Sequence, residues 1–194
     1  MPSNKLFILS GPSGSGQDSI IVGLRSHFEI ERVITTTTRA MRPGESQGQP
    51  YYFISAEEFQ QKIKAGEFVE YAQEYNDHFY GVTKSELERV TNSGKVGIWK
   101  IEYKGVIAVK KMFPGIIAIL SNAPSLAVLE KRIRERDKGA SEEYIQERMD
   151  YTKEWLKHKD IYDFEVMNEE GKLDEAIAKT AQIIQNTLDE QKSS

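Results

Sequence analysis

The sequence LFILSGPSGSGQDSII, residues 6–21, decides the fold. Its apolar start is typical of a strand, its middle is rich in glycine and serine, and apolar residues return at Ile20 and Ile21. A strand, a glycine-rich turn and a helix, in that order, form a phosphate-binding loop, in which backbone N–H groups and the helix N-terminus face an anion. The spacing of Gly11 and Gly16 fits this pattern. We therefore predict a phosphate-binding loop close to the start of the chain.

The loop departs from the usual pattern at the two positions that carry its polar chemistry. In G-x-x-x-x-G-K-S/T the lysine reaches the β- and γ-phosphates and the hydroxyl binds Mg²⁺, but this chain has Gln17 and Asp18 there. A glycine-rich stretch can also be no more than a turn, although the flanking strand and helix favour the phosphate loop. The predicted loop residues are Gly11, Ser13, Gly14, Ser15, Gly16, Gln17, Asp18 and Ser19.

Composition places the chain among ordinary soluble globular proteins. Its 194 residues are 39% hydrophobic and 29% charged, which fits one domain with a substantial core. The net charge of −4 gives no general electrostatic footprint for nucleic acid, and no stretch approaches the roughly 18 apolar residues of a membrane span. The lack of cysteine excludes disulfides and thiol nucleophiles. We expect a cytoplasmic protein without nucleic-acid or membrane partners, and the sequence does not indicate its oligomeric state.

Strand-like and helix-like segments alternate along the rest of the chain, which predicts an α/β fold with a parallel sheet. Capping boxes mark helix starts, uninterrupted apolar runs mark buried strands, and an apolar stripe marks the last helix. These segments are the boxes at 55–58 and 83–86, the strands at 96–101, 116–120 and 164–166, and the stripe from Leu173 to Leu188.

The segment TTTTRAMRPGE, residues 35–45, and the aromatic residues after it suit a phosphate monoester. Arg39 and Arg42 are three residues apart, and guanidinium groups bind phosphate oxygens in a bidentate manner. A glutamate on a neighbouring segment could accept two N–H bonds from a guanine edge. The alternative is a threonine-rich strand with solvated arginines, and this segment alone does not exclude it.

Taken together, these segments resemble the guanylate kinase family. The match rests on GPSGSG, TTTTRAMRPGE, PYYF, EFVEYA and YG in this order, and it continues through RIRERD and QERM across nearly the whole chain. The resemblance implies a P-loop NTPase three-layer fold with a parallel central sheet, and transfer of a phosphoryl group from ATP to GMP with Mg²⁺. It also implies a core of 1–34, 84–134 and 150–194, a GMP-binding insert at 35–83 and a lid at about 135–149.

The same resemblance implies how GMP is bound. Glu70 is expected to read guanine, and Glu102 matches an aspartate of the family that also helps at the base. Val82 stands where the family usually has a serine or threonine that contacts guanine. The residues expected at the GMP phosphate are Thr35, Arg39, Arg42, Tyr51 and Tyr80.

On the ATP side the resemblance points to cations of the lid and to one amide. Arg136 and Arg148 match arginines of the lid and its flank that close on the transferred phosphoryl group, and Arg132 is a weaker match. Asn168 matches an asparagine near adenine.

Lys100 stands where the family has an aspartate, so that a lysine is missing from the loop and another has appeared on a strand. Its stem is long enough to bring the ammonium near Gln17, and Asp18 could then ligate Mg²⁺. Independent losses in a decayed site are the alternative. We therefore list Lys100, Arg136, Arg148 and Gln17 as the expected catalytic residues.

Three functions remain open at this point. The first is a working GMP kinase, and the second is a pseudokinase or binding module that keeps the GMP pocket. The third is a kinase for another small phosphate ester, such as ribose bisphosphate, because a relative of guanylate kinase with that activity shares the Asp18-Ser19 ending of the loop.

Overall fold

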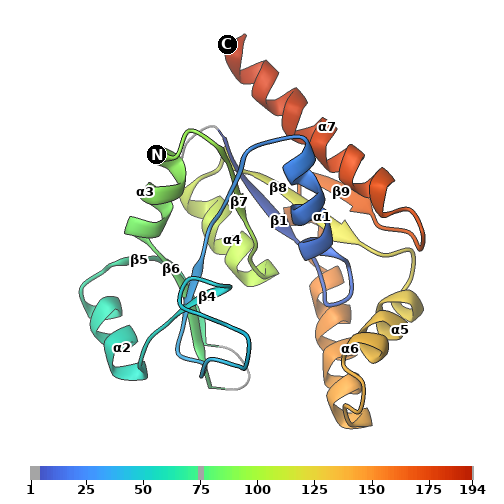
Figure 1. Cartoon of the computed structure of the whole chain (residues 1–194), viewed down its shortest axis with the longest axis horizontal. Coiled ribbons are helices and arrows are strands. Elements are labelled where there is room, and N and C mark those ends of the chain that lie inside the picture. The colour runs from blue at the N-terminus through green and yellow to red at the C-terminus, as the bar shows by residue number, and fades with distance from the viewer. Residues whose placement is uncertain (1–4, 74–76, 194) are drawn as a thin grey trace.

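The computed structural model describes residues 5–73 and 77–193, and its centre is a sheet of five parallel strands (Figure 1). The strands are β1 (Leu6–Ser10), β2 (Ile30–Arg32), β7 (Val96–Trp99), β8 (Ile117–Asn122) and β9 (Phe164–Met167). Their order is β2-β7-β1-β8-β9, so the first strand of the chain lies in the middle. Ile8 lies opposite both Trp99 and Ala118. The predicted parallel α/β fold is confirmed.

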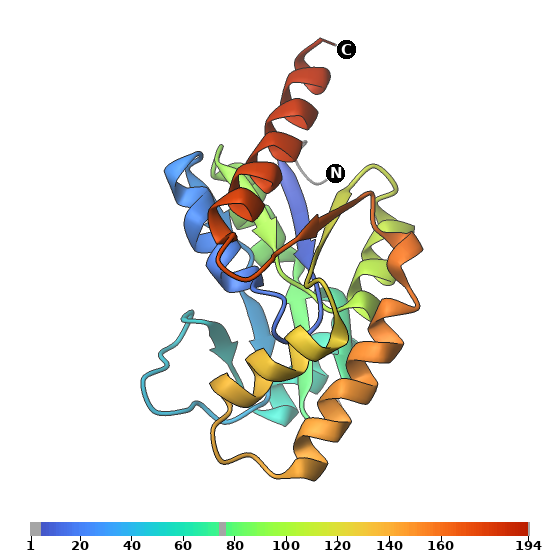
Figure 2. The ribbon, with the colours of Figure 1, turned by 90° about the vertical axis from the view of Figure 1, so that its right-hand side faces the viewer.

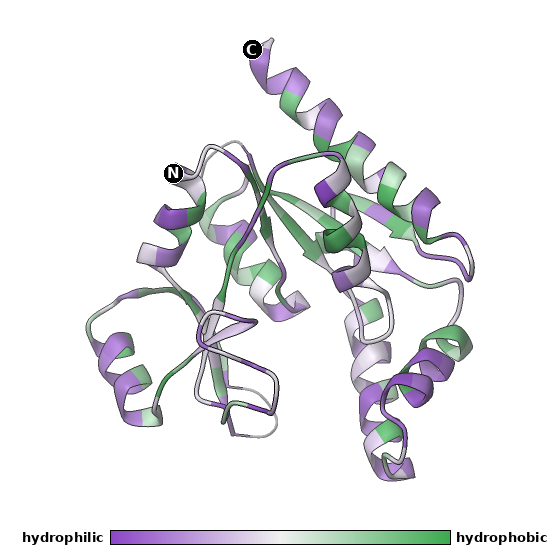
Figure 3. Ribbon diagram, in the orientation of Figure 1, coloured by the Kyte–Doolittle hydropathy of each residue, from purple (hydrophilic) through white to green (hydrophobic). Residues whose placement is uncertain are grey.

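Helices cover both faces of this sheet, which gives three layers (Figures 1 and 3). The helices are α1 (Gln17–Gly23), α3 (Lys84–Asn92), α4 (Tyr103–Met112) and α7 (Leu173–Lys192), and short 3-10 turns span Leu24–Ser26 and Lys159–Ile161. Because side chains alternate along a strand, Phe7 and Leu9 pack with α1 and α7, whereas Leu6 and Ile8 pack with α3 and α4. Both faces of β1 are therefore buried.

A second, smaller sheet lies between β2 and α3 in the chain. Its strands are β3 (Thr35–Thr37), β4 (Tyr51–Phe53), β5 (Phe68–Gln73) and β6 (Phe79–Thr83), in the order β4-β3-β6-β5, and α2 (Ala56–Lys64) packs beside it. Phe59 of α2 is fully buried and stacks on Phe68 with ring centres 4.3 Å apart. The ring centre of Phe79 lies 5.4 Å from that of Phe59. This insert thus has an aromatic core of its own.

A buried carboxylate ties the insert to the central domain. The Glu86 side chain, on α3, accepts hydrogen bonds from the Ile34 backbone N–H at 2.7 Å and from the Tyr52 hydroxyl at 3.3 Å. The Arg89 guanidinium neutralises it at 2.8 Å. A charge that is 4% exposed needs such partners, because burial without them is costly. The connection before β3 is therefore fixed by α3.

A helical hairpin follows β8 (Figure 2). It consists of α5 (Leu126–Arg136) and α6 (Glu142–Leu156), with a small apolar cluster of Ile133, Ile145 and Met149 between them. The expected lid boundary at 149 falls inside the continuous helix α6, because the chain has a capping serine at Ser141 but no helix breaker near 149. The division into core, insert and lid stays a prediction.

Local sequence signals placed most element starts correctly. The Ser55 hydroxyl accepts from the Glu58 N–H at 3.0 Å, and the Thr83 hydroxyl accepts from the Glu86 N–H at 3.2 Å, so both capping boxes form. Strand ends were less accurate, since the strand predicted at 96–101 ends at Trp99. None of the helices in the described part of the chain combines the length and apolar character needed to cross a bilayer.

Replacing Ile21 by alanine should lower the free energy of unfolding by about 2–5 kcal/mol, because its side chain is fully buried in the cluster between α1, α7 and the sheet. Val22 on the same helix is 63% exposed, so Val22→Ala should change that free energy by no more than about 0.5 kcal/mol. Urea denaturation of both variants measures the difference. Equal losses would contradict this orientation of α1.

Candidate active site

The loop that joins β1 to α1 has the backbone of an anion cradle. Gly14 and Gly16 have φ angles of 84° and 89°, a left-handed conformation that turns successive N–H groups toward one side. A Cβ at position 16 would lie 2.1 Å from Nδ2 of Asn168, so only glycine fits. The buried hydroxyl of Ser15 has no hydrogen-bond partner within the described residues. Its burial cost is relieved when a ligand oxygen accepts from it.

Residues from three other elements brace the loop. The Ser15 carbonyl accepts hydrogen bonds from the Ser121 hydroxyl at 2.9 Å and from the Asn168 side-chain amide at 3.0 Å. Arg132 donates to the Gly14 carbonyl at 3.2 Å and to the Asn168 carbonyl at 2.9 Å. Asn168 is only 6% exposed, so its amide supports the loop in this structure and the expected adenine contact stays a prediction. Arg132 likewise has a bracing role here.

Gln17 folds back into the loop. Its side chain is 9% exposed, and its amide N–H donates to the Gly11 carbonyl oxygen. The side chain at the usual lysine position therefore stabilises the turn itself and contributes no charge. Ser19, two residues further on, is exposed in the first turn of α1.

Asp18 pairs with two cations. Its Oδ2 lies 2.6 Å from Nζ of Lys100, and its Oδ1 lies 3.2 Å from a guanidinium nitrogen of Arg32. Partial burial opposes ionisation of Asp18, but the charges and hydrogen bonds of Lys100 and Arg32 outweigh it and lower the pKa of this carboxyl. The sequence predicted that Lys100 comes near the loop. It gave no signal for Arg32.

The Asp18 pairs disagree with the expected role of Asp18 as a magnesium ligand. Mg²⁺ is usually bound through one or two carboxylates together with substrate phosphates and water. Here both oxygens of Asp18 already face cations. Across residues 5–73 and 77–193, no three histidine or acidic side chains gather closely enough to hold a metal ion. Asp18 as a magnesium ligand therefore stays a prediction, and in this structure its carboxylate is engaged by Lys100 and Arg32.

A phosphate-sized set of polar groups lies on the insert around Arg39. Its guanidinium lies 5.4 Å from the ring centres of Tyr51 and of Phe53, and the Tyr51 and Tyr80 rings are 5.9 Å apart. Thr35 is opposite Tyr51 in the strand register. Strands β3, β4 and β6 thus bring together four of the five residues predicted at the GMP phosphate, and the fifth, Arg42, follows with an exposed side chain.

Glu45 is a residue of this pocket that sequence reasoning missed. Its carboxylate binds the Arg39 guanidinium at 2.7 and 3.0 Å and accepts from the Arg42 N–H at 2.8 Å. Hydrogen bonding to Arg39 lowers the pKa of Glu45, and the bond to the Arg42 N–H adds to this. The signal was present in RAMRPGE, because the turn at Pro43-Gly44 directs the acid back to the first arginine.

The two acids predicted at the base converge on the start of α4. A Cβ added at Gly105 would lie 3.7 Å from Oε2 of Glu70, and Glu102 is the residue immediately before that helix. The Tyr151 hydroxyl of α6 hydrogen-bonds Oε2 of Glu102. Val82 is fully buried in the apolar cluster with Leu6 and Ile8 and offers no surface to a base. The apolar surroundings of Val82 explain why this position has valine in place of serine or threonine.

The lid arginines differ in their placement. Arg136 donates to the Ser13 hydroxyl at 3.0 Å, so the end of α5 reaches the phosphate loop. Arg148 donates to the Tyr144 hydroxyl at 3.2 Å and lies 5.2 Å from the centre of that ring. Of the two predicted cations, Arg136 is at the loop and Arg148 is on the neighbouring helix.

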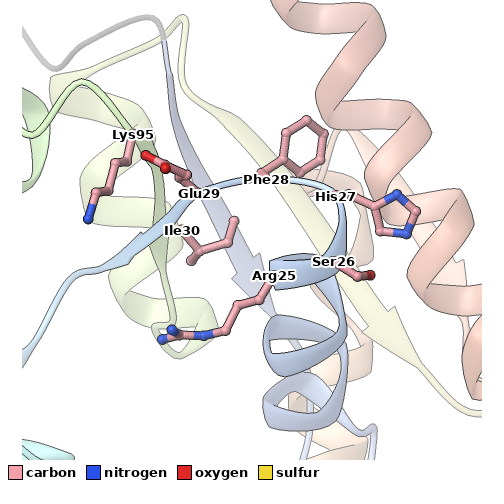
Figure 4. A pocket seen from close by; sticks show the side chains of 7 residues that line it. All are labelled: Arg25, Ser26, His27, Phe28, Glu29, Ile30 and Lys95. Carbon is pink, nitrogen blue, oxygen red and sulfur yellow. The ribbon is translucent and has the colours of Figure 1, made fainter.

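The loop and the insert pocket are within electrostatic reach of each other. Burial is the main cause that raises the pKa of Tyr51, and the negative charge of Asp18 contributes in the same direction. A separate hollow of about 420 Å³ lies at the amino-terminal ends of β2 and β7, lined by Arg25, Ser26, His27, Phe28, Glu29, Ile30 and Lys95 (Figure 4). It contains none of the predicted site residues.

The chain resembles guanylate kinases in both sequence and structure. A family model described as guanylate kinase matches residues 3–187. The guanylate kinase of Fusobacterium nucleatum is 36% identical over 96% of this chain and 98% of its own length, and that of Trichormus variabilis is 37% identical over 87% and 84%. A crystal structure of guanylate kinase from Anaplasma phagocytophilum superposes with a TM-score of 0.71 at 26% identity, covering 93% of this chain and 84% of that one.

Stability should fall between about pH 10 and pH 12 through a tyrosine behind the site. Tyr162 donates to the Ser10 oxygen at 2.9 Å and accepts from the Trp155 indole N–H at 2.9 Å, and burial raises its pKa to about 12. The unfolded pKa is about 10, so the folded state binds more protons in this window and its stability declines as pH rises. Denaturant unfolding at pH 9, 10 and 11 should show a smaller decline in Tyr162→Phe. An unchanged slope would contradict this.

Proposed function

Because the chain belongs to the guanylate kinase family, we propose that it transfers the γ-phosphoryl group of ATP to GMP, giving ADP and GDP. The observation that carries this proposal is that one chain has a phosphate loop, a buried arginine beside Tyr51 and Tyr80, and two acids that meet at the start of α4. In the reaction the bond from the γ-phosphorus to the bridging oxygen breaks and a phosphate oxygen of GMP bonds to that phosphorus. No covalent enzyme intermediate is needed.

The pocket around Arg39 suits the acceptor phosphate. Arg39 is 8% exposed, and the Tyr51 and Phe53 rings fix its plane. A guanidinium held in this way binds phosphate oxygens with little further loss of freedom. Glu45 holds Arg39 until a phosphate competes for it, and Arg42 adds a second cation from the exposed side.

The acids at the far end suit guanine. A guanine edge offers the N1–H and the 2-amino group as adjacent donors, whereas adenine has no donor at either position, so a carboxylate selects guanine. Glu70 is proposed to accept these bonds and Glu102, held by Tyr151, to assist. Val82 is proposed to act indirectly, by anchoring in the apolar core the strand that pairs with Glu70.

Positive charge near the reacting phosphates comes from the chain itself in this proposal. Arg136 is already at the loop, and Arg148 and Arg132 lie on the hairpin that follows β8. Phosphoryl transfer depends mainly on such positioning and charge stabilisation. Magnesium, which ATP-dependent transfer usually uses, enters here with the nucleotide phosphates. We also propose a cytoplasmic location.

The two alternative functions have less support. The relatives named above are guanylate kinases, which favours neither a pseudokinase nor a ribose bisphosphate kinase. A coupled assay of ADP formation with GMP, dGMP, AMP, CMP, UMP and ribose bisphosphate separates all three functions. Turnover with GMP and dGMP alone supports the proposal, whereas no turnover with any acceptor or turnover with the sugar phosphate alone rejects it.

Replacing Glu70 by alanine should weaken GMP binding tenfold or more, because a guanine edge left without its partner costs about 1–3 kcal/mol. Calorimetry with GMP and AMP measures the change and should show AMP binding unaffected. Glu67→Ala is the matched control, since that carboxylate pairs with Lys62 on the outside of the insert. Wild-type protein that binds AMP and GMP equally would reject the base assignment.

Removing the cations at the acceptor phosphate should weaken the binding of GMP much more than the binding of guanosine. Arg39→Ala and Arg42→Ala should each abolish or strongly weaken GMP binding and barely change guanosine binding, because guanosine has no phosphate to lose. Arg25→Ala is the control, because Arg25 is an exposed arginine of the separate hollow in Figure 4. Arg42 is exposed, so its variant retains the fold even if that of Arg39 does not. Parallel losses for both ligands would indicate a general surface-charge effect.

A further inference from the structure

We propose that Lys100 and Arg32, held by Asp18, supply the positive charge that the loop lacks at Gln17 and bind the phosphoryl group during its transfer. Lys100 is the catalytic residue in this proposal, Asp18 is its positioning residue, and Arg32 is the second cation. The proposal rests on the proposed function, because it concerns the same reaction.

The first support is the charge at the loop. Asp18 is the only charged residue of the segment 11–19, and an acid alone would repel a triphosphate. Its two partners lie at 2.6 and 3.2 Å, so the group of Lys100, Asp18 and Arg32 carries one net positive charge. The loop thus has the same sign of charge that a lysine at position 17 would bring.

The second support is where the cations come from. Lys100 follows β7, which is the neighbour of β1, and Arg32 ends β2, which lies on the other side of β7 and leads into the insert. Ligands of open parallel sheets bind at the carboxyl ends of the strands. Lys100 and Arg32 therefore lie at the end of the sheet where ligands bind, in contact with Asp18 of the loop.

The third support is the exposure of these ion pairs. The side chains of Lys100, Arg32 and Asp18 are 35%, 33% and 62% exposed. Partly exposed ion pairs contribute little to stability, so replacing these residues should leave the fold intact and reveal any effect on activity. The same exposure allows the ammonium and guanidinium to exchange part of their contact with Asp18 for phosphate oxygens.

The fourth support is the state of Gln17. Its buried amide is engaged with the Gly11 carbonyl, so it is not directed at a ligand. A decayed loop and a relocated charge both allow a neutral residue at position 17. Relocation predicts that cations converge on the adjacent residue, and Lys100 and Arg32 do so from 82 and 14 residues away in the chain.

The test begins with Lys100→Ala in the full-length chain. Turnover with ATP and GMP should fall by about a hundredfold or more, whereas the dissociation constant of GMP should not change, as expected for loss of a transition-state contact. Lys95→Ala is the matched control, because Lys95 flanks the other end of β7 and is also an exposed, paired lysine. Unchanged turnover in Lys100→Ala overturns the proposal.

A double-mutant cycle tests the role of Asp18. If Asp18 acts by holding Lys100 and Arg32, then Asp18→Asn lowers turnover in the wild-type background and lowers it by a clearly smaller factor in the Lys100→Ala background, where only Arg32 is left to hold. The magnesium concentration that gives half-maximal rate stays the same in Asp18→Asn. Additive losses, together with a higher magnesium requirement, would instead make Asp18 a metal ligand and overturn its positioning role.

Substitution at Gln17 distinguishes relocation from decay. Gln17→Lys should raise turnover little in the wild-type background, because it would crowd two ammonium groups, but it should partly restore turnover in Lys100→Ala. A decayed site predicts the opposite, with Lys100→Ala silent and Gln17→Lys creating activity. Thermal unfolding of each variant verifies that the fold is retained.

Binding of ATP separates this proposal from the proposed function. Calorimetry should show weaker ATP binding in Lys100→Ala and in Arg32→Ala than in wild type and Lys95→Ala. If wild type transfers phosphate to no acceptor but these two variants still bind ATP more weakly, the function fails and the phosphate contact stands. If GMP is phosphorylated and both variants bind ATP and turn over normally, the function stands and the charge relocation is wrong.

Discussion

Two hydrogen bonds to the carbonyl of Ser15 hold together the part of the molecule on which everything else depends. They come from Ser121 at the end of β8 and from Asn168 just after β9, so the phosphate loop is fastened to two strands that follow it by more than a hundred residues. Ordering the flexible glycines of the loop costs conformational entropy. The two hydrogen bonds help to offset this cost and hold the loop in one conformation. Arg136 can reach the Ser13 hydroxyl only because the loop is fixed there.

Most charged side chains near this loop come from other segments of the chain. Lys100 and Arg32 approach from the insert side through Asp18, whereas Arg136 approaches from the hairpin of α5 and α6. The acceptor pocket repeats the arrangement, with Arg39 held by Glu45 in the absence of a ligand. At both places an acid keeps a cation in position.

Much of the fold could be predicted from the sequence, because its signals are local. The apolar run before Gly11 and the capping boxes at Ser55 and Thr83 depend on neighbouring residues only. The resemblance to one family added the pocket residues. What could not be predicted depends on contacts between distant segments: the pairing of Asp18 with Arg32, the bracing role of Asn168 and the complete burial of Val82. A side chain's type limits its partners, but only the packed sheet determines which partner is reached.

The central place of β1 has a consequence for synthesis on the ribosome. Both neighbours of β1 are made long after it, since β7 begins at residue 96 and β8 at residue 117, so the earliest strand waits unpaired while the next hundred residues emerge. The small sheet of the insert uses one contiguous stretch, residues 35–83, and has its own aromatic core. Local contacts form sooner than distant ones. The strands of the small sheet are therefore all available before the phosphate loop has the two neighbouring strands that hold it.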